Sequence, residues 1–302
     1  MKKEVDDLAL GRRGLIRSGG VGGTLALLAS ATPAGATAVA PPPVDTDFAP
    51  DFTLIKINSD DDSFARVQKK GLVVGTSNDW PYSFMDPKSN EWSGLDADII
   101  KYIAKMLKIS RIDVQTVTFD GLIPGLLDGR FDIVGDSIHY TKNRSKVVNF
   151  CFPTYYYAEA LVVPKGNPKK LHQLTDLKGC TVGSLLGTNY AEWLQAVPGV
   201  NFQGYKDWAQ IIPELAIGRT DAALFDQPVV SAQMKQHPEW KIEIVGDYEP
   251  RTFKNPAGYS SYAFRQGDIQ WVTAFSSAVQ WMQYNNKMKD ILSSWGLTGY
   301  NN

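Results

Sequence analysis

Residues 119–168 read FDGLIPGLLDGRFDIVGDSIHYTKNRSKVVNFCFPTYYYAEALVVPKGNP, and this stretch decides the fold. Leucine and isoleucine at helical spacing predict a short helix over 121–127, which Gly129 ends. The apolar residues at 131–134 predict a buried strand, and polar residues lead from it to Arg144. Open α/β sheets bind small ligands at the carboxyl ends of their strands. The stretch therefore predicts a ligand cleft beside Arg144.

Five pieces of the chain carry a family resemblance. The run D-G-L-I-P-x-L-x-x-G-x-F-D at 120–132, followed by an arginine, resembles the bacterial extracellular solute-binding proteins of family 3. These proteins are the capture subunits of polar amino-acid ABC importers. The other pieces, in family order, are KGLVVGTSNDW at 70–80, GLDADII at 94–100, DLKGCTVGSLLGT at 176–188 and TDAALFD at 220–226. The resemblance spans roughly residues 64 to 296. It implies the type II periplasmic-binding-protein fold.

Two alternations of strand and helix predict two α/β lobes, each with a mainly parallel sheet and flanking helices. The first is expected to have strands at 72–76, 112–119 and 131–137 and helices at 95–107, 121–127 and 142–147. The second is expected to have strands at 180–185, 201–205, 221–225 and 242–245 and helices at 189–196, 208–217 and 228–236. A strand at 259–265 resembles the family's return strand, and helices between 268 and 295 would pack on the first lobe.

The predicted domain limits follow from these alternations. Residues 52–157 with 262–302 form lobe 1, residues 158–261 form lobe 2, and two crossing segments at 155–164 and 258–265 form a two-strand hinge. Proline fixes φ and the stretch 41–51 lacks apolar periodicity, so it is expected to be an extended linker.

Residues 1–40 are expected to be an export signal. Arg12 and Arg13 resemble a twin-arginine pattern, with Gly11 where that pattern prefers Ser or Thr. An apolar run at 21–31 follows, and small-residue sites end at Ala36 and Ala40. The run is shorter than the ~20 residues that span a bilayer, and no cysteine suits a lipoprotein anchor. The alternative is an unstructured Gly/Ala tail; export predicts a soluble periplasmic protein.

Composition suits a globular protein and excludes some partners. The chain has 302 residues, of which 43% are hydrophobic and 21% charged, with a net charge of −1. Without residues 1–40, 26 basic residues face 29 acidic ones. Because no polybasic surface results, nucleic acid is not an expected partner. A monomer is expected.

The two cysteines, Cys151 and Cys180, leave two possibilities open. An oxidising compartment permits a disulfide, which would restrain the two lobes. We favour two buried free thiols, because free cysteine packs as a small hydrophobe.

Three residues are predicted to bind the polar ends of a small zwitterion. The guanidinium of Arg144 can hold a carboxylate through two parallel hydrogen bonds, and the resemblance implies that it clamps the ligand's α-carboxylate. The resemblance likewise implies that Asp226 binds the amine. Thr188 opens a helix whose free N–H groups would receive the same carboxylate. The alternatives are a solvated helix arginine for Arg144 and a helix cap for Asp226.

Five further residues complete the predicted site. Asp79, Trp80 and Tyr82 form a third wall on the loop after the first strand, where aromatic faces can stack on a side chain or attract a cation. Ser137 can offer a hydroxyl or carbonyl to an amine. His139 departs from the family pattern: related amino-acid binders carry Ser or Thr there, and ectoine binders an aromatic. An imidazole at this position can stack, donate a hydrogen bond or titrate; the alternative is a histidine satisfied by backbone.

Four functions are weighed. The resemblance favours a non-catalytic binding protein that delivers its ligand to an ABC permease in the membrane. An ectoine-type compatible-solute binder is a variant of it, and an accessory protein of a periplasmic quinoprotein dehydrogenase is another use of the fold. A cyclohexadienyl or arogenate dehydratase is disfavoured, because those enzymes carry an acid shortly after the position of Asp226 and this chain does not.

Other chemistries lack their residues. His139, His172, His237 and the two cysteines show no zinc-ligand spacing. The chain also contains no G-x-S-x-G or G-x-x-x-x-G-K-[ST] run. We therefore expect no metal, no cofactor and no catalytic residue.

Overall fold

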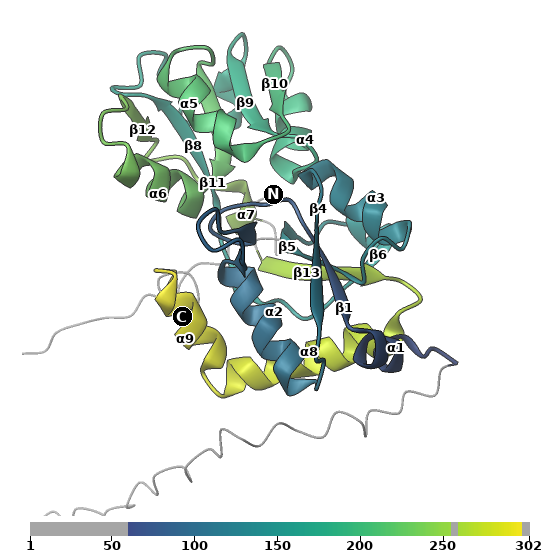
Figure 1. The fold of residues 1–302 in the computed structure, drawn as a ribbon. Coiled ribbons are helices and arrows are strands. Elements are labelled where there is room, and N and C mark those ends of the chain that lie inside the picture. Colours follow the sequence, from purple (N-terminus) through teal and green to yellow (C-terminus); the bar gives the residue numbers. More distant parts are fainter. Residues whose placement is uncertain (1–59, 255–258, 298–302) are drawn as a thin grey trace, which may run out of the picture. The chain divides into compact units, whose positions relative to one another are not determined.

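The computed structural model describes residues 60–254 and 259–297 (Figure 1). The predicted export signal at 1–40 and linker at 41–51 lie outside these residues. Within them, the chain builds two sheets flanked by helices. Among the described residues, no helix has the length and apolar character needed to cross a bilayer.

The first sheet has the strand order β4-β1-β5-β13-β6. Its strands are β1 (Leu72–Thr76), β4 (Ile112–Thr116), β5 (Ile133–His139), β6 (Val148–Phe150) and β13 (Tyr259–Arg265), and the short β7 (Tyr155–Tyr156) pairs with β13. β1 is parallel to β4 and β5, whereas β13 is antiparallel to β5 and β6. All seven residues of β5 are buried, so this strand forms the centre of the first lobe.

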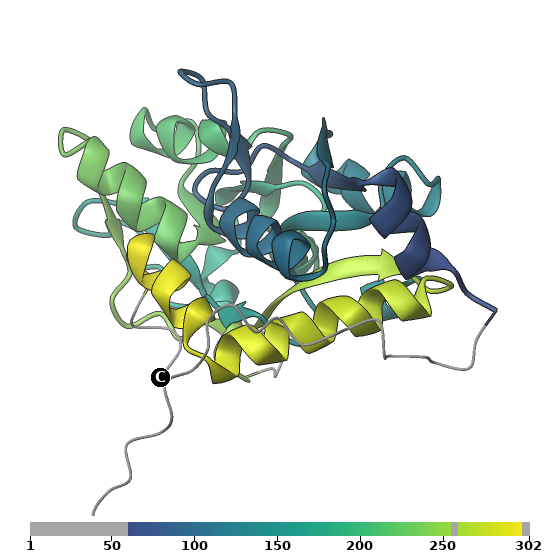
Figure 2. The same ribbon diagram turned by 60° about the horizontal axis from the view of Figure 1, so that its bottom comes forward.

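The helices of the first lobe within the described residues are α1 (Ser63–Lys70), α2 (Leu95–Met106), α3 (Leu122–Leu127), α8 (Ile269–Tyr284) and α9 (Lys287–Ser294). A two-stranded ribbon, β2 (Phe84–Met85) and β3 (Trp92–Ser93), precedes α2. The long helix α8 runs along β13 and contacts α1 and α2 (Figure 2). Trp271 and Phe275 of α8 are fully buried against Phe264 of β13. The C-terminal helices therefore complete the core of the first lobe, although they are far from its other elements in the sequence.

The second sheet has the strand order β10-β9-β11-β8-β12. Its strands are β8 (Glu159–Pro164), β9 (Thr181–Leu185), β10 (Asn201–Tyr205), β11 (Ala222–Asp226) and β12 (Ile242–Ile244). Its helices are α4 (Asn189–Gln195), α5 (Ile211–Ala216), α6 (Gln227–Gln236) and α7 (Arg251–Lys254). β9, β10 and β11 are parallel, and β8 runs antiparallel to β11 and β12. Each lobe thus combines three parallel strands with antiparallel strands beside the crossing segments.

Two expected elements are shorter in the structure, for identifiable reasons. The strand expected at 112–119 ends at Thr116, because its partner β1 ends opposite it at Thr76. The helix expected at 142–147 is only a 3₁₀ turn, Arg144–Lys146, since β6 already begins at Val148. Both truncations leave loop at the carboxyl ends of strands, where small ligands bind in α/β folds.

The chain passes between the sheets twice among the described residues. It leaves the first sheet after β7 and enters β8 at Glu159. It returns to the first sheet in β13, which begins at Tyr259. The predicted domain limit placed this return three residues later, at 262. Asp96, in the first turn of α2, holds both crossing strands. Its Oδ1 accepts hydrogen bonds from Tyr155 Oη (2.9 Å) and Tyr262 Oη (2.6 Å).

The two cysteines do not form a disulfide. Cys151 and Cys180 are buried free thiols. This confirms the favoured alternative, and no disulfide restrains the lobes.

Candidate ligand-binding cleft

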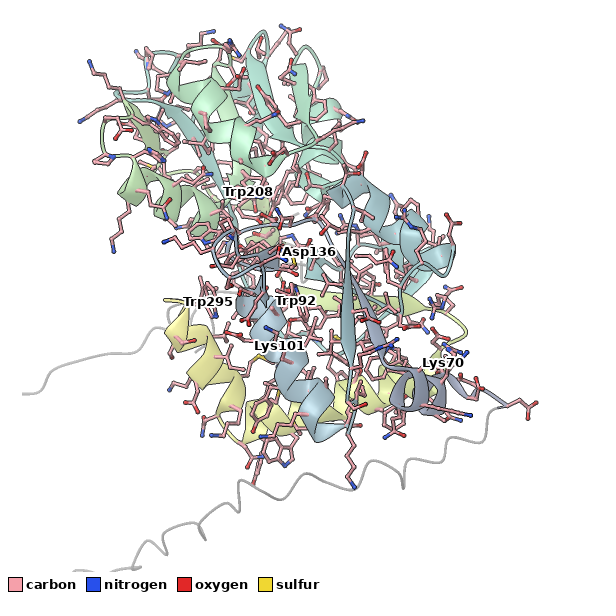
Figure 3. All side chains as sticks on the ribbon, in the orientation of Figure 1. Lys70, Trp92, Lys101, Asp136, Trp208 and Trp295 are labelled. Atoms are coloured by element: carbon pink, nitrogen blue, oxygen red, sulfur yellow. The ribbon has the colours of Figure 1, made fainter. Side chains whose placement is uncertain are left out.

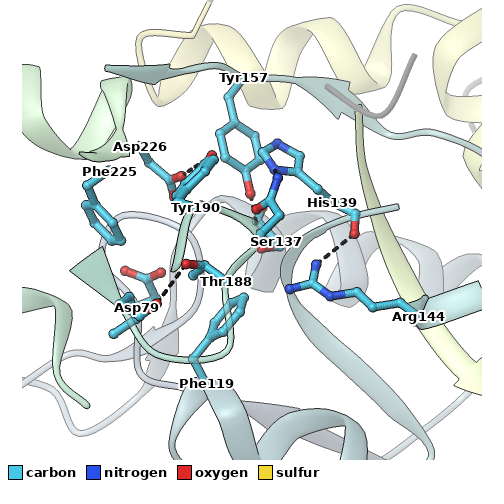
Figure 4. Close-up of a pocket in the computed structure, with 12 residues that line it drawn as sticks. Asp79, Phe119, Ser137, His139, Arg144, Tyr157, Thr188, Tyr190, Phe225 and Asp226 are labelled. Carbon is cyan, nitrogen blue, oxygen red and sulfur yellow. Dashed lines mark hydrogen bonds between the residues drawn. The ribbon is translucent and has the colours of Figure 1, made fainter. Parts of the chain in front are cut away.

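A cavity lies between the two lobes and is lined by residues of both (Figure 4). Its empty volume is about 250 Å³, including space open to solvent. The lining residues are Asp79, Phe119, Ser137, His139, Arg144, Tyr157, Leu185, Thr188, Asn189, Tyr190, Phe225 and Asp226. Six of the eight predicted site residues belong to this set; Trp80 and Tyr82 do not.

Arg144 begins the 3₁₀ turn after β5 and reaches across the cavity. Its Nη1 donates to the carbonyl of His139 (2.7 Å) and its Nη2 to the carbonyl of Gly187 (2.9 Å) in the second lobe. The guanidinium lies over the ring of Phe119, 5.8 Å from its centroid. Desolvation lowers the pKa of Arg144, but the group stays charged near neutral pH. It therefore offers its remaining N–H groups to an anion in the cleft.

His139 ends β5 as a neutral, buried imidazole. Its ring stacks on Tyr157 at a centroid distance of 4.2 Å and meets the edge of Tyr190. Burial, followed by the nearby charge of Arg144, lowers the pKa of His139 to about 3. Its Nδ1 lies 3.4 Å from Asn189 Nδ2, and its Nε2 has no hydrogen-bond partner among the described residues. Of the predicted possibilities, the geometry shows stacking, and the lowered pKa of His139 places its titration well below neutral pH.

Asp226 ends β11 in the second lobe and is 6% exposed. Its Oδ1 accepts a hydrogen bond from Tyr190 Oη at 2.7 Å. Although Asp226 occupies the N-cap position of α6, its side chain makes no capping hydrogen bond. Burial is the main cause that raises its pKa to about 7, with a further contribution from the charge of Glu159. The carboxylate is thus directed to the cavity rather than to its own helix.

Thr188 has a capping role within its lobe. Its Oγ1 accepts from the N–H of Ala191 (3.1 Å) and donates to the carbonyl of Leu185 (2.7 Å). The neighbouring Gly187 has a φ of +81°, and a Cβ there would stand 2.7 Å from the Cα of Asp120 in the first lobe. A glycine is therefore required at this close approach of the two lobes.

Ser137 and Asp79 connect the cavity to a group of buried carboxylates in the first lobe. Ser137 Oγ donates to Asp96 Oδ2 (3.0 Å), and the Ser137 carbonyl accepts from Tyr157 Oη (3.2 Å). Desolvation raises the pKa of Asp96 to about 7 and that of Asp136 to about 6. For Asp79, burial and then the charge of Asp136 raise the pKa well above its usual value. Several buried carboxyl groups therefore lie in the first lobe at or near the cleft.

Trp80 and Tyr82 take other places than the predicted wall. Tyr82 is fully buried and stacks with Tyr155. Trp80 stacks on Trp208 of the second lobe, with ring centroids 6.4 Å apart, and Trp208 Nε1 donates to the carbonyl of Asn78 (3.1 Å). Figure 3 shows Trp208 where the two lobes meet. These contacts, with the bond from Arg144 to Gly187, hold the lobes together in a closed arrangement.

Some of the lining residues that sequence reasoning did not select stand beside selected ones, and others do not. Phe119 precedes the DGLIP run, and Asn189 and Tyr190 follow Thr188 directly. Tyr157 ends the YYY run before the crossing. Their aromatic and amide side chains look like core residues in a sequence, so only the folded chain shows that they face the cavity. Leu185 and Phe225 complete this set.

No group of three or more histidine, cysteine or acidic residues within the described part of the chain has the geometry to hold a metal ion.

Two α/β lobes, linked by two crossings and enclosing a cavity with an arginine on one side and carboxylates on the other, define a bilobal small-molecule-binding protein. The chain belongs to the bacterial extracellular solute-binding proteins of family 3, whose family model matches residues 72–298.

Relatives and solved structures agree with that assignment. A probable amino-acid ABC transporter-binding protein of Haemophilus influenzae is 28% identical over 232 residues, covering 76% of this chain and 86% of the relative. The L-cystine-binding protein TcyJ of Escherichia coli is 27% identical, covering 80% and 88%. The structure of an ancestral arginine-binding protein bound to arginine is similar with a TM-score of 0.67 and 31% identity, covering 74% of this chain and 97% of that one.

Proposed function

We propose that this protein is the capture subunit of an ABC importer and binds a small zwitterion, an amino acid or a related compound, between its lobes. Arg144 would bind the carboxylate and Asp226 the ammonium group. The observation that carries the proposal is that these two side chains, from different lobes, line one cavity. A ligand that bridges them interacts more favourably with the closed arrangement than with an open one.

The family supports the proposed location and partner of the protein. Family members are extracellular or periplasmic, and the H. influenzae relative is named as a transporter-binding protein. We infer that the chain works outside the cytoplasmic membrane and presents its closed form to a permease. The predicted export signal and the monomeric state are parts of this proposal.

Binding without catalysis is the better-supported use of the cleft. The residues after Asp226 are Gln227, Pro228, Val229 and Val230, and both valines are fully buried. No acidic side chain follows Asp226 into the cavity among the described residues, which supports capture over a dehydratase reaction. The stack of His139 on Tyr157 keeps an aromatic-like surface at the position where ectoine binders carry an aromatic, so ectoines belong among the ligands to be tested.

A thermal-shift screen tests the proposed function. The purified protein is heated with single amino acids, ectoine, hydroxyectoine and quaternary amines, each at high concentration. A ligand at 100 times its Kd adds about 2.7 kcal/mol of stability, so at least one carboxylated amine is expected to raise Tm by several degrees. If no compound shifts Tm, the capture function is contradicted and the accessory role gains support.

The affinity for an ammonium-bearing ligand is expected to rise with pH. In the free protein the pKa of Asp226 is about 7, so the carboxyl holds a proton at lower pH and must release it to pair with a cation. Between pH 6 and 8 the Kd should fall by roughly 10-fold, with proton release on binding. Calorimetry in two buffers of different ionisation enthalpy measures both effects. A Kd independent of pH, or the same pH dependence in Asp226→Asn, would refute this role.

A further inference from the structure

The carboxylate of Asp79 has no partner in the part of the chain that the structure describes. The residue is 3% exposed, forms no ion pair, and its Oδ1 is enclosed without a hydrogen bond. Its backbone carbonyl accepts the N–H groups of Tyr82 and Ser83, both at 2.8 Å, so the turn of the loop fixes the side chain at the cavity. Burying a carboxylate is costly unless it is paired. A group that enters the cavity can supply that pair.

The charges around the cavity are unbalanced. Asp79 and Asp226 line it, and Arg144 is the only lysine or arginine among the described lining residues. Behind Asp79, Asp136 Oδ2 accepts from Ser77 N (2.6 Å), whereas its Oδ1 is also buried without a partner. A zwitterion that pairs with Arg144 and Asp226 leaves Asp79 unpaired. One more positive charge on the ligand would compensate it.

The position of Asp79 suits the far end of a ligand. Figure 4 shows Asp79 and Asp226 on one side of the cavity and Arg144 on the other. The rings of Phe225, Phe119 and Tyr157 also line the space. Aromatic faces attract cations electrostatically, so both the carboxylate and its surroundings favour a positively charged group.

We infer that the ligand carries a second cationic group bound by Asp79, so that it is an amino acid with a guanidinium or a second ammonium on its side chain and a net charge of +1. The inference rests on the proposed function, because the carboxylate and the α-ammonium are already assigned there.

Matched ligand pairs test the inference by calorimetry. L-Arginine is compared with L-citrulline, in which a neutral urea replaces the guanidinium, and L-lysine with L-norleucine. In at least one pair the cationic member should bind roughly 100-fold more tightly or better, as expected for a buried charge pair. Asp79→Asn should bring that ratio to within about 5-fold of unity, because the variant keeps the shape of the side chain and removes its charge.

Asp113→Asn is the matched control. Asp113 is exposed on β4 and does not line the cavity. Its removal should leave the ratio unchanged. If neutral members or other neutral zwitterions bind as tightly as the cationic ones, the inference fails while the capture function stands; if no amino acid binds, the capture function itself fails. If Asp79→Asn does not fold, the Kd ratios of the matched ligand pairs in the wild-type protein still test whether the ligand carries a second cationic group.

Discussion

Replacing Arg144 with alanine is expected to weaken the binding of a carboxylated ligand by roughly 100-fold or more. Truncating one partner of a buried, hydrogen-bonded charge pair costs ~2–5 kcal/mol. The variant also loses the bond from Nη2 to the carbonyl of Gly187, which helps to join the lobes. Calorimetry with the tightest ligand of the thermal-shift screen measures the change in Kd.

The matched control for this prediction is Arg130→Ala. Arg130 is an exposed arginine of the same lobe and lies outside the cavity lining, so its loss should change Kd by less than about 2-fold. Arg144→Lys separates charge from geometry, because an ammonium keeps the charge and loses the planar fork. Its affinity should lie between those of wild type and Arg144→Ala. A carboxylated ligand that Arg144→Ala binds with unchanged affinity would refute the carboxylate assignment.

Asp96→Ala is expected to have the largest effect on folding. Its carboxylate accepts from Tyr155, Tyr262 and Ser137, of which the two tyrosines lie on the strands next to the two crossings. Alanine would leave three buried hydroxyls without this acceptor, at a cost of ~3–5 kcal/mol. At roughly 2–4 °C per kcal/mol for a domain of this size, Tm should fall by about 10 °C. Thermal unfolding near pH 6 measures it.

Two further variants show whether the loss of stability comes from the lost hydrogen-bond acceptor. Asp96→Asn keeps an oxygen acceptor for the tyrosine hydroxyls and should lose less stability. Asp113→Ala removes an exposed carboxylate of the same lobe that pairs with Arg111 at 3.0 Å, and it should change stability by about 0.5 kcal/mol or less. Equal losses for Asp96→Ala and Asp113→Ala would show that Asp96 does not hold the crossing strands.

The sequence predicted the two lobes because their signals are local. Apolar strands bounded by glycine, such as Leu72–Thr76, and amphipathic helices, such as Leu95–Met106, form where periodicity places them. The ends of elements were less predictable, since they depend on partners. Thr116 ends its strand because β1 ends opposite it, a fact that only the sheet register contains.

Site residues were predictable where the chain itself places polar groups at strand ends. Arg144, Asp226 and His139 line the cavity for this reason. Trp80 and Tyr82 were predicted from the same loop, yet the partner of Trp80 is Trp208, more than a hundred positions away in the chain. The roles of Tyr157 and Tyr190 depend on how the lobes face each other. No local pattern distinguishes such a ring from a core residue.

The most direct measurement of the central claim is a crystal structure of the protein with the tightest-binding amino acid from the screen. The account predicts the ligand in the cavity between the lobes, with its carboxylate within hydrogen-bond distance of the Arg144 guanidinium and its ammonium on Asp226. A ligand bound elsewhere, or one bound in this cavity with its carboxylate away from Arg144, would contradict it.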